Sequence, residues 1–185
     1  MLSFFKSSNM VKFALYDYIP ERYLKRASFE DMETHRRILD FKDGRNYAVR
    51  WAAREIGNAL SSMEMSRTVL VCIPASCKRT NDRRYKKFSS MVCERLGCEN
   101  GFDYVQVVGK RRKVHVSHVH ELAADGFVQI DESRLAGKTV VLVDDIVTSC
   151  KTADAFIDKM SLAGANVLMT IFLAKTKSYR RNSYS

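Results

Sequence analysis

The clearest structural signal in the sequence is the segment Thr139-Val-Val-Leu-Val-Asp-Asp-Ile-Val-Thr-Ser-Cys-Lys-Thr152. It begins with an unbroken apolar run, Thr139 to Val143, which is typical of a strand buried on both faces of a parallel sheet. Two carboxylates, Asp144 and Asp145, follow this run, and a hydroxyl-rich turn then leads into a predicted helix at about 152–162. Ligands of open α/β sheets bind at the carboxyl ends of the strands, so this stretch predicts a binding site.

The rest of the chain alternates apolar runs with amphipathic segments. Further strands are predicted at 68–73, 104–108 and 166–174, and further helices at 45–62 and 84–96. Strands that alternate with helices and are continuously apolar are typical of a mainly parallel sheet with helices on both faces. Residues before about 38 show no clear period, so we interpret them as an extended arm or as edge strands.

Composition and charge limit the functional classes. The chain has 185 residues, of which 46% are hydrophobic and 28% charged, and its formal net charge is +10. Such a chain is expected to form one globular domain that attracts polyanions, either nucleic acid or phosphorylated metabolites. No apolar run approaches the roughly 20 residues that span a bilayer, and the N-terminus lacks a signal-peptide pattern. We therefore predict a cytoplasmic protein without a membrane partner.

The five cysteines form no CxxC pair and are predicted to be free thiols.

The turn and the acidic pair suit different parts of one ligand. Hydroxyls at Thr148, Ser149 and Thr152, together with the free amides at a helix N-terminus, can bind an anion. Two carboxylates so close by would repel that anion, so they must contact another group. A sugar phosphate meets both conditions, because Asp144 and Asp145 can accept hydrogen bonds from ribose hydroxyls or contact them through hydrated Mg²⁺. The alternative is that the two aspartates only form a turn and a helix cap.

In its order of strand, acidic pair, hydroxyl loop and helix, the segment resembles the signature of type I phosphoribosyltransferases, which bind 5-phosphoribosyl-1-pyrophosphate (PRPP). The resemblance implies a single-domain, Rossmann-like α/β fold with a flexible hood loop. It also implies Mg²⁺ as cofactor and transfer of ribosyl 5-phosphate to a nitrogenous base, with release of pyrophosphate. A homodimer is expected from the same resemblance.

The resemblance assigns roles to particular residues. Asp144 and Asp145 would be catalytic and would contact the metal through water. The PRPP site would contain both of them and the residues that follow: Ile146, Val147, Thr148, Ser149, Cys150, Lys151 and Thr152. The family usually has glycine at the position of Cys150, where a missing Cβ lets the backbone approach the phosphate.

Within the superfamily, the chain is most similar to the ComF-like branch, from about residue 38 onward. Three segments carry this resemblance: Ile38–Arg45, Ile73–Arg79 and Arg83–Phe88. The second lies where related enzymes contact pyrophosphate, which gives five further candidates: Ala75, Ser76, Cys77, Lys78 and Arg79. The alternative for Lys78 and Arg79 is an ordinary solvated basic turn. The cysteine-rich zinc segment of many ComF-like proteins is absent from this sequence.

The basic stretch Lys110–His120 lies where the superfamily has its flexible catalytic loop. Arg111 and Arg112 are therefore candidate catalytic residues that would bring positive charge to the pyrophosphate. The glutamine and the Arg-x-x-Asn pair of the ComF-like pattern are missing from residues 115–127. The three histidines, His115, His118 and His120, are interpreted as part of a polar loop, with metal binding as the alternative.

These observations divide the chain into an N-terminal arm or edge segment (1–37), a phosphoribosyltransferase-like domain (38–176) and a basic tail expected to be disordered (177–185). The expected partners are PRPP, pyrophosphate and a nucleobase acceptor. A second hypothesis is a non-catalytic PRPP or nucleotide sensor, or a ComF-like accessory protein that binds nucleic acid through its basic surface. A third is a plain α/β domain with a similar strand and loop.

Overall fold

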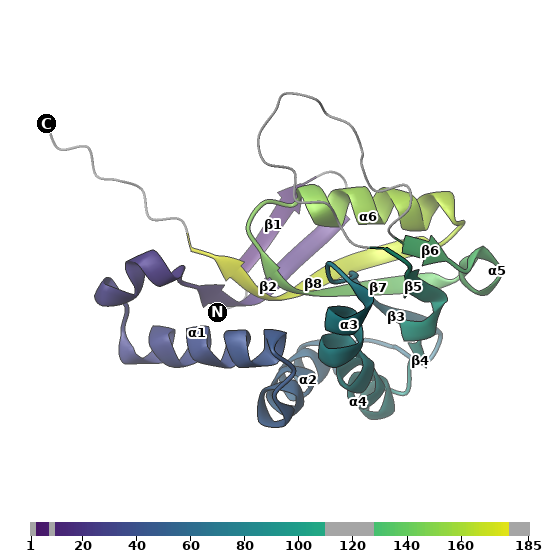
Figure 1. Cartoon of the computed structure of the whole chain (residues 1–185). Coiled ribbons are helices and arrows are strands. Elements are labelled where there is room, and N and C mark those ends of the chain that lie inside the picture. The colour runs from purple at the N-terminus through teal and green to yellow at the C-terminus, as the bar shows by residue number, and fades with distance from the viewer. Residues whose placement is uncertain (1–2, 8–9, 110–127, 178–185) are drawn as a thin grey trace, which may run out of the picture.

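A computed structural model describes residues 3–7, 10–109 and 128–177 as an α/β domain built on one central sheet (Figure 1). The sheet has six strands in the order β1-β2-β8-β7-β3-β4. All neighbours are parallel except β1 and β2, which form an antiparallel pair at one edge. The strands are β1 (Ser3–Ser7), β2 (Met10–Tyr18), β3 (Thr68–Cys72), β4 (Glu99–Asn100), β7 (Thr139–Val147) and β8 (Asn166–Thr176). The predicted α/β fold with a mainly parallel sheet is therefore confirmed.

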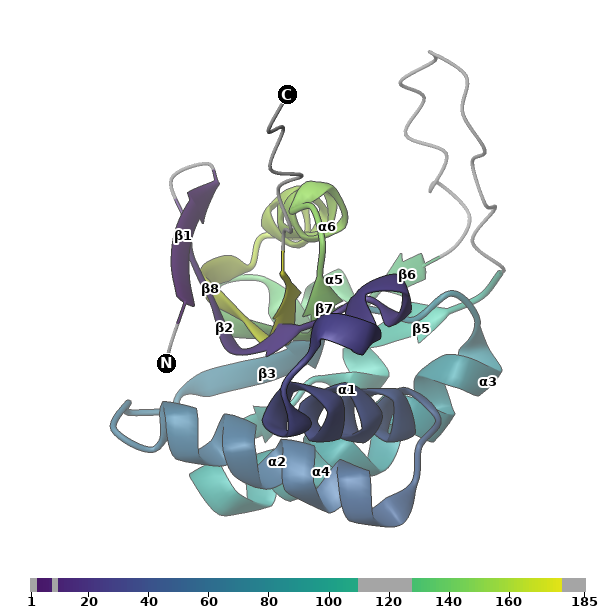
Figure 2. The ribbon, with the colours of Figure 1, turned by 90° about the vertical axis from the view of Figure 1, so that its left-hand side faces the viewer.

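Helices cover both faces of this sheet. Figure 2 shows α6 on one side and α1, α2 and α4 on the other. The main helices are α1 (Phe29–Lys42), α2 (Asn46–Leu60), α4 (Lys87–Leu96) and α6 (Lys151–Leu162). Shorter elements are η1 (Glu21–Arg26), α3 (Lys78–Asn81), the π-helical η2 (Asp82–Lys86), η3 (Phe102–Tyr104) and α5 (Glu132–Leu135). Among the described residues, no helix has the length and apolarity needed to cross a membrane.

The core forms two layers because alternate residues of a strand point to opposite faces. On β7, Val141 and Val143 pack with the layer under α1, α2 and α4. Val140 and Leu142 pack with the layer under α6. All four are at most 1% exposed. The continuous apolar run of β7 therefore fills both layers and fixes the strand near the middle of the sheet.

The N-terminal region differs in part from its expected form. β1 and β2 lie at one edge of the sheet, but residues from Phe29 onward form α1, so an extended interpretation is wrong for that part. Ser28 caps α1 in a capping box with Asp31. This local signal for a helix start is independent of hydrophobic periodicity. The boundary placed at residue 38 falls inside α1, and the division of the chain into segments stays a prediction.

Two other strands differ from expectation. The predicted strand at 104–108 is β5 (Val105–Val107), which pairs with β6 (Val128–Ile130) in a separate antiparallel ribbon outside the main sheet. β7 continues to Val147, four residues beyond its apolar run, because β8 keeps pairing with it after β3 has ended. Asp144 and Asp145 therefore lie inside β7, at a place where β8 is its one paired strand among the described residues.

Candidate functional site

A cavity of about 380 Å³ opens where β3 and β7 end. Both strands run parallel, so the loops that follow them meet at the same edge of the sheet. Nine of the predicted site residues line this cavity: Ala75, Ser76, Asp144, Asp145, Ile146, Val147, Thr148, Ser149 and Thr152. The structure thus brings together the acidic pair, the hydroxyl loop and the turn after β3, although about 70 residues of sequence separate the two loops.

Asp144 is held by neutral hydrogen-bond donors. The Tyr85 hydroxyl donates to its Oδ1 at 2.8 Å, and the Asp145 amide donates to the same oxygen at 2.8 Å. Burial raises the pKa of Asp144 to about 7, and the nearby carboxylate of Asp145 adds to the rise. Tyr85 is fully buried, which raises its own pKa well above the ordinary value and keeps its hydroxyl a donor. In the described part of the chain, Oδ2 of Asp144 is the oxygen left for a ligand.

Asp145 is held by charged donors instead. Its side chain is 8% exposed, and its Oδ2 accepts a short hydrogen bond from Nη1 of Arg84. Lys42 Nζ lies 3.9 Å from the same oxygen, while Oδ1 accepts the Ile146 amide at 2.6 Å. Both carboxylate oxygens are therefore engaged by the protein itself. This arrangement makes Asp145 the more constrained member of the acidic pair.

The hydroxyl loop after β7 is open to the cavity. Thr148 and Ser149 are exposed, and the Thr148 and Thr176 hydroxyl oxygens lie 2.8 Å apart. The twelve-residue α6 begins directly afterwards, at Lys151, so its first amides lie beside these hydroxyls. A hydroxyl loop at a helix N-terminus can bind a phosphate group through hydrogen bonds and through the helix dipole.

Cys150 fits this loop without backbone strain. It has a φ of −68° and a ψ of −4°, values that any L-residue adopts. Its partly buried side chain packs against the apolar layer under α6. Neither Cys150 nor Lys151 lines the cavity. The cysteine side chain therefore stabilises the loop by packing against the core.

The turn after β3 is fixed by a buried amide. Asn81 is 6% exposed, and its Oδ1 accepts the Ala75 amide at 3.0 Å. Lys78 does not line the cavity. It forms an exposed ion pair with Asp82 at 2.7 Å and borders a neighbouring hollow of about 480 Å³. Cys77 and Arg79 do not line the cavity either, and Arg111 and Arg112 lie outside the described residues.

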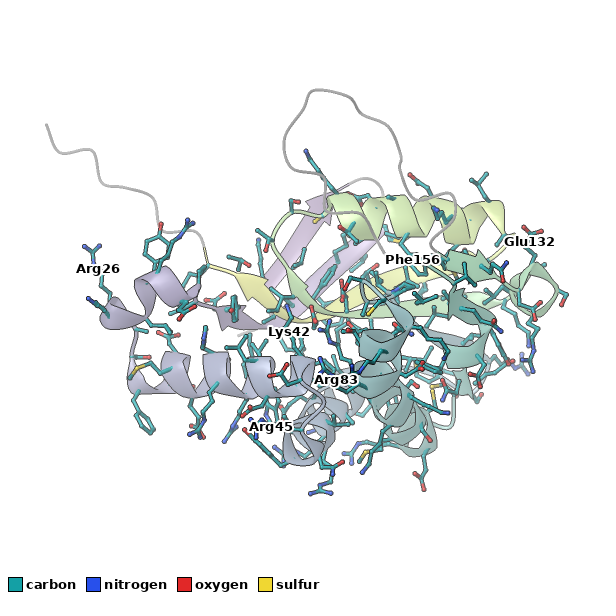
Figure 3. All side chains as sticks on the ribbon, viewed as in Figure 1. Arg26, Lys42, Arg45, Arg83, Glu132 and Phe156 are labelled. Atoms are coloured by element: carbon teal, nitrogen blue, oxygen red, sulfur yellow. The ribbon has the colours of Figure 1, made fainter. Side chains whose placement is uncertain are left out.

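The sequence reasoning missed three residues around the acidic pair: Lys42 and Arg84, which line the cavity, and the buried Tyr85, which contacts Asp144. Lys42 ends α1, and Arg84 and Tyr85 lie in η2, far from the motif in sequence. Figure 3 labels Lys42 at the end of α1 and Arg83, the residue before Arg84 in η2. The basic-aromatic character of Arg83–Phe88 was a signal, but nothing in the pattern indicated which of its residues would reach the acidic pair.

The acidic pair fits Mg²⁺ only in part. Carboxylate oxygens are ligands that Mg²⁺ prefers, and Oδ2 of Asp144 could accept a hydrogen bond from a metal-bound water. Asp145 has both oxygens occupied. Among the described residues, no group of three or more His, Cys, Asp or Glu could hold a metal. These residues suit an ion that arrives with its ligand and contacts Asp144 through water.

Comparison with known proteins assigns the family. The family model for the phosphoribosyl transferase domain matches residues 44–185. This chain belongs to the phosphoribosyl transferase family. The expected type I fold is confirmed with it, and both loops at the cavity lie within the matched residues. No curated protein matches the chain significantly.

Solved structures of phosphoribosyltransferases resemble the chain at low identity. An adenine phosphoribosyltransferase from Thermoanaerobacter pseudethanolicus is 21% identical over 71% of this chain and 70% of its own, with a TM-score of 0.46. One from Leishmania tarentolae is 13% identical over 94% of each chain, with a TM-score of 0.47. A hypoxanthine phosphoribosyltransferase from Staphylococcus aureus is 17% identical over 74% of this chain and 70% of its own, with a TM-score of 0.41.

Proposed function

We propose that this phosphoribosyl transferase domain binds PRPP and transfers its ribosyl 5-phosphate group to a nitrogenous base. One observation carries the proposal: a single cavity joins an acidic pair, of which Asp145 is buried, to an open hydroxyl loop at a helix N-terminus. Asp144 would accept a hydrogen bond from a ribose hydroxyl, and Thr148, Ser149 and Thr152 would hold the 5′-phosphate. The bond between the anomeric carbon and pyrophosphate would break, and a bond to the base nitrogen would form.

Mg²⁺ would be held by oxygens of PRPP and would contact Asp144 through water. When bound, it would supply positive charge to the leaving pyrophosphate. The protein's own part would be to hold the ribose and the 5′-phosphate so that the attacking nitrogen and the anomeric carbon meet in line. Family resemblance also leads us to propose a homodimer, with residues 38–176 as the transferase domain.

Calorimetric titration of PRPP, with and without Mg²⁺, tests the binding step. We expect binding by the wild type and a loss of about a hundredfold or more in the Asp144→Asn/Asp145→Asn variant, since the ribose contact of Asp144 and the charge of the acidic pair would change. Asp82→Asn, which alters an exposed ion pair, is the matched control and should bind like the wild type. Absence of PRPP binding to the folded wild type at millimolar concentration would refute the proposal. If PRPP binds, the release of pyrophosphate in the presence of a panel of purines and pyrimidines tests turnover.

A second candidate is a protein that binds PRPP or a nucleotide without turnover. It is favoured by one observation: neither Lys78 nor Arg79 lines the cavity, so the turn after β3 brings no lysine or arginine of its own, among the described residues, to a pyrophosphate there. A ComF-like accessory role in nucleic-acid binding belongs to the same class. PRPP binding without pyrophosphate release would support the sensor, and DNA binding that weakens steeply with salt would support the accessory role.

A further inference from the structure

The cavity is lined by positive charges of the protein itself. Among the described residues, two cations and two carboxylates line it: Lys42, Arg84, Asp144 and Asp145. Arg84 contacts Asp145 directly, and both side chains are largely shielded from water, at 12% and 8% exposure. A buried guanidinium that is hydrogen-bonded to a carboxylate supplies the local positive charge that a bound cation would otherwise supply.

The position of Arg84 is fixed by close packing between two turns of the chain. It belongs to η2, a π-helical segment of the kind that is frequent at functional sites. The turn between α1 and α2 lies directly against η2 at Gly44, which has a φ of +69°. A Cβ on Gly44 would be 2.6 Å from Arg83 Cγ and 2.7 Å from the Arg83 carbonyl oxygen, so only glycine permits this approach. Arg84 Nε also lies 3.4 Å from the Lys42 carbonyl oxygen.

We propose that Arg84 is the resident counter-charge of Asp145 and lets the sugar-phosphate half of the ligand bind without a divalent metal. This inference rests on the proposed function. A bare carboxylate beside the hydroxyl loop would repel an incoming phosphate, and Arg84 removes that repulsion before the ligand arrives. Mg²⁺ is then needed only for the pyrophosphate half of PRPP. Arg84 acts through Asp145 and is a positioning residue.

Ribose 5-phosphate is the probe that separates the two halves of the ligand, because it lacks pyrophosphate. Calorimetry with ribose 5-phosphate, in Mg²⁺ and in EDTA, should give dissociation constants that differ by less than about threefold for the wild type. PRPP should bind more weakly in EDTA than in Mg²⁺. This arm of the experiment uses only the wild-type protein, so it does not depend on whether a variant folds.

Variants at Arg84 test the assignment of the counter-charge. Arg84→Gln should weaken ribose 5-phosphate binding in EDTA by about tenfold or more, and Mg²⁺ should restore part of the loss. Arg84→Lys keeps the positive charge and should retain metal-free binding within about threefold of the wild type. Arg83→Gln is the matched control, since Arg83 is exposed and its nearest carboxylate oxygen, on Asp43, is 3.8 Å away. Thermal unfolding of each variant shows whether it is folded.

Two results would overturn the inference and leave the proposed function standing. One is a wild-type protein that binds PRPP with Mg²⁺ but needs the metal to bind ribose 5-phosphate. The other is a folded Arg84→Gln variant that binds ribose 5-phosphate in EDTA as tightly as the wild type. If the wild type binds neither ligand with or without metal, the proposed function fails and the inference fails with it.

Discussion

The neighbouring strands β7 and β3 both end at the same edge of the sheet, but their ends are held by different interactions. At the end of β7, a buried carboxylate pairs with Arg84, and a second carboxylate with a raised pKa lies beside it. At the end of β3, a neutral amide, Asn81, fixes the turn, and the ion pair of Lys78 is exposed. The first arrangement concentrates charge at the cavity, whereas the second only fixes the backbone of the turn that lines the cavity. Substitutions should therefore have larger effects at the end of β7.

The largest difference in stability between the two strand ends should appear when their ion pairs are removed. Asp145→Asn leaves the guanidinium of Arg84 in a site that is only 12% exposed, so we expect the free energy of unfolding to fall by about 3 kcal/mol. Asp82→Asn removes the exposed pair with Lys78 and should change it by about 0.5 kcal/mol or less. Urea denaturation of both variants measures these values. Equal losses of unfolding free energy in the two variants would show that burial does not make the ion pair at the end of β7 more important for stability than the one at the end of β3.

The next effect concerns pH. The Asp144 carboxyl has a pKa of about 7 in the folded protein and an ordinary value of 3.8. Between these values the folded state keeps a proton that the unfolded chain has lost, so this group makes stability fall as pH rises through that window. Asp144→Asn removes the penalty, and because the side chain is partly exposed we expect it to stabilise the protein by about 2 kcal/mol at about pH 8.

The same substitution should have almost no effect at about pH 3, below both pKa values, where the wild-type carboxyl is protonated in the folded state and mostly protonated in the unfolded state. Urea midpoints across this pH range measure the difference. Ser90→Ala, at an exposed position without a titratable side chain, provides the control and should show no such trend. A constant gain from Asp144→Asn at every pH would contradict the raised pKa.

A smaller effect is expected at the end of β3. Asn81→Ala leaves the Ala75 amide without its acceptor, which should lower the free energy of unfolding by about 1–2 kcal/mol. Ser90→Ala, at an exposed position of α4, is the control and should be neutral. Chemical denaturation gives both values, and hydrogen exchange at Ala75 should accelerate in the first variant alone. If exchange at Ala75 is unchanged, Asn81 does not fix the turn.

The smallest effect is expected at Cys150, which bears on whether a glycine is needed in the loop after β7. Because its backbone is unstrained and its side chain packs under α6, Cys150→Gly should lower stability by about 0.5–1 kcal/mol. PRPP affinity should stay within about threefold of the wild-type value. Thermal unfolding and calorimetry measure the two quantities. A large gain in PRPP affinity would mean that the Cβ of Cys150 does obstruct the phosphate.

Sequence patterns predicted the strands β3, β7 and β8 and the helices α2, α4 and α6 to within a few residues, except at the far end of β7. They succeeded because long apolar runs and helical periods are local signals. They missed α1, whose stripe of buried residues is narrow, and they placed the strand at 104–108 without showing that it leaves the main sheet. Strand pairing depends on partners that are distant in sequence, so short strands such as β5 cannot be assigned to a sheet locally.

For the site, the sequence by itself determined the acidic pair, the hydroxyl loop and the following helix, since all three lie within one continuous segment whose chemistry can be read directly. The folded arrangement was needed to show that Arg84, Tyr85 and Lys42 neutralise or hydrogen-bond that pair, and that Lys78 does not line its cavity. The physical reason is that a side chain's partner is set by packing between elements, here the approach of the α1–α2 turn to η2 and of η2 to β7, which no local pattern encodes.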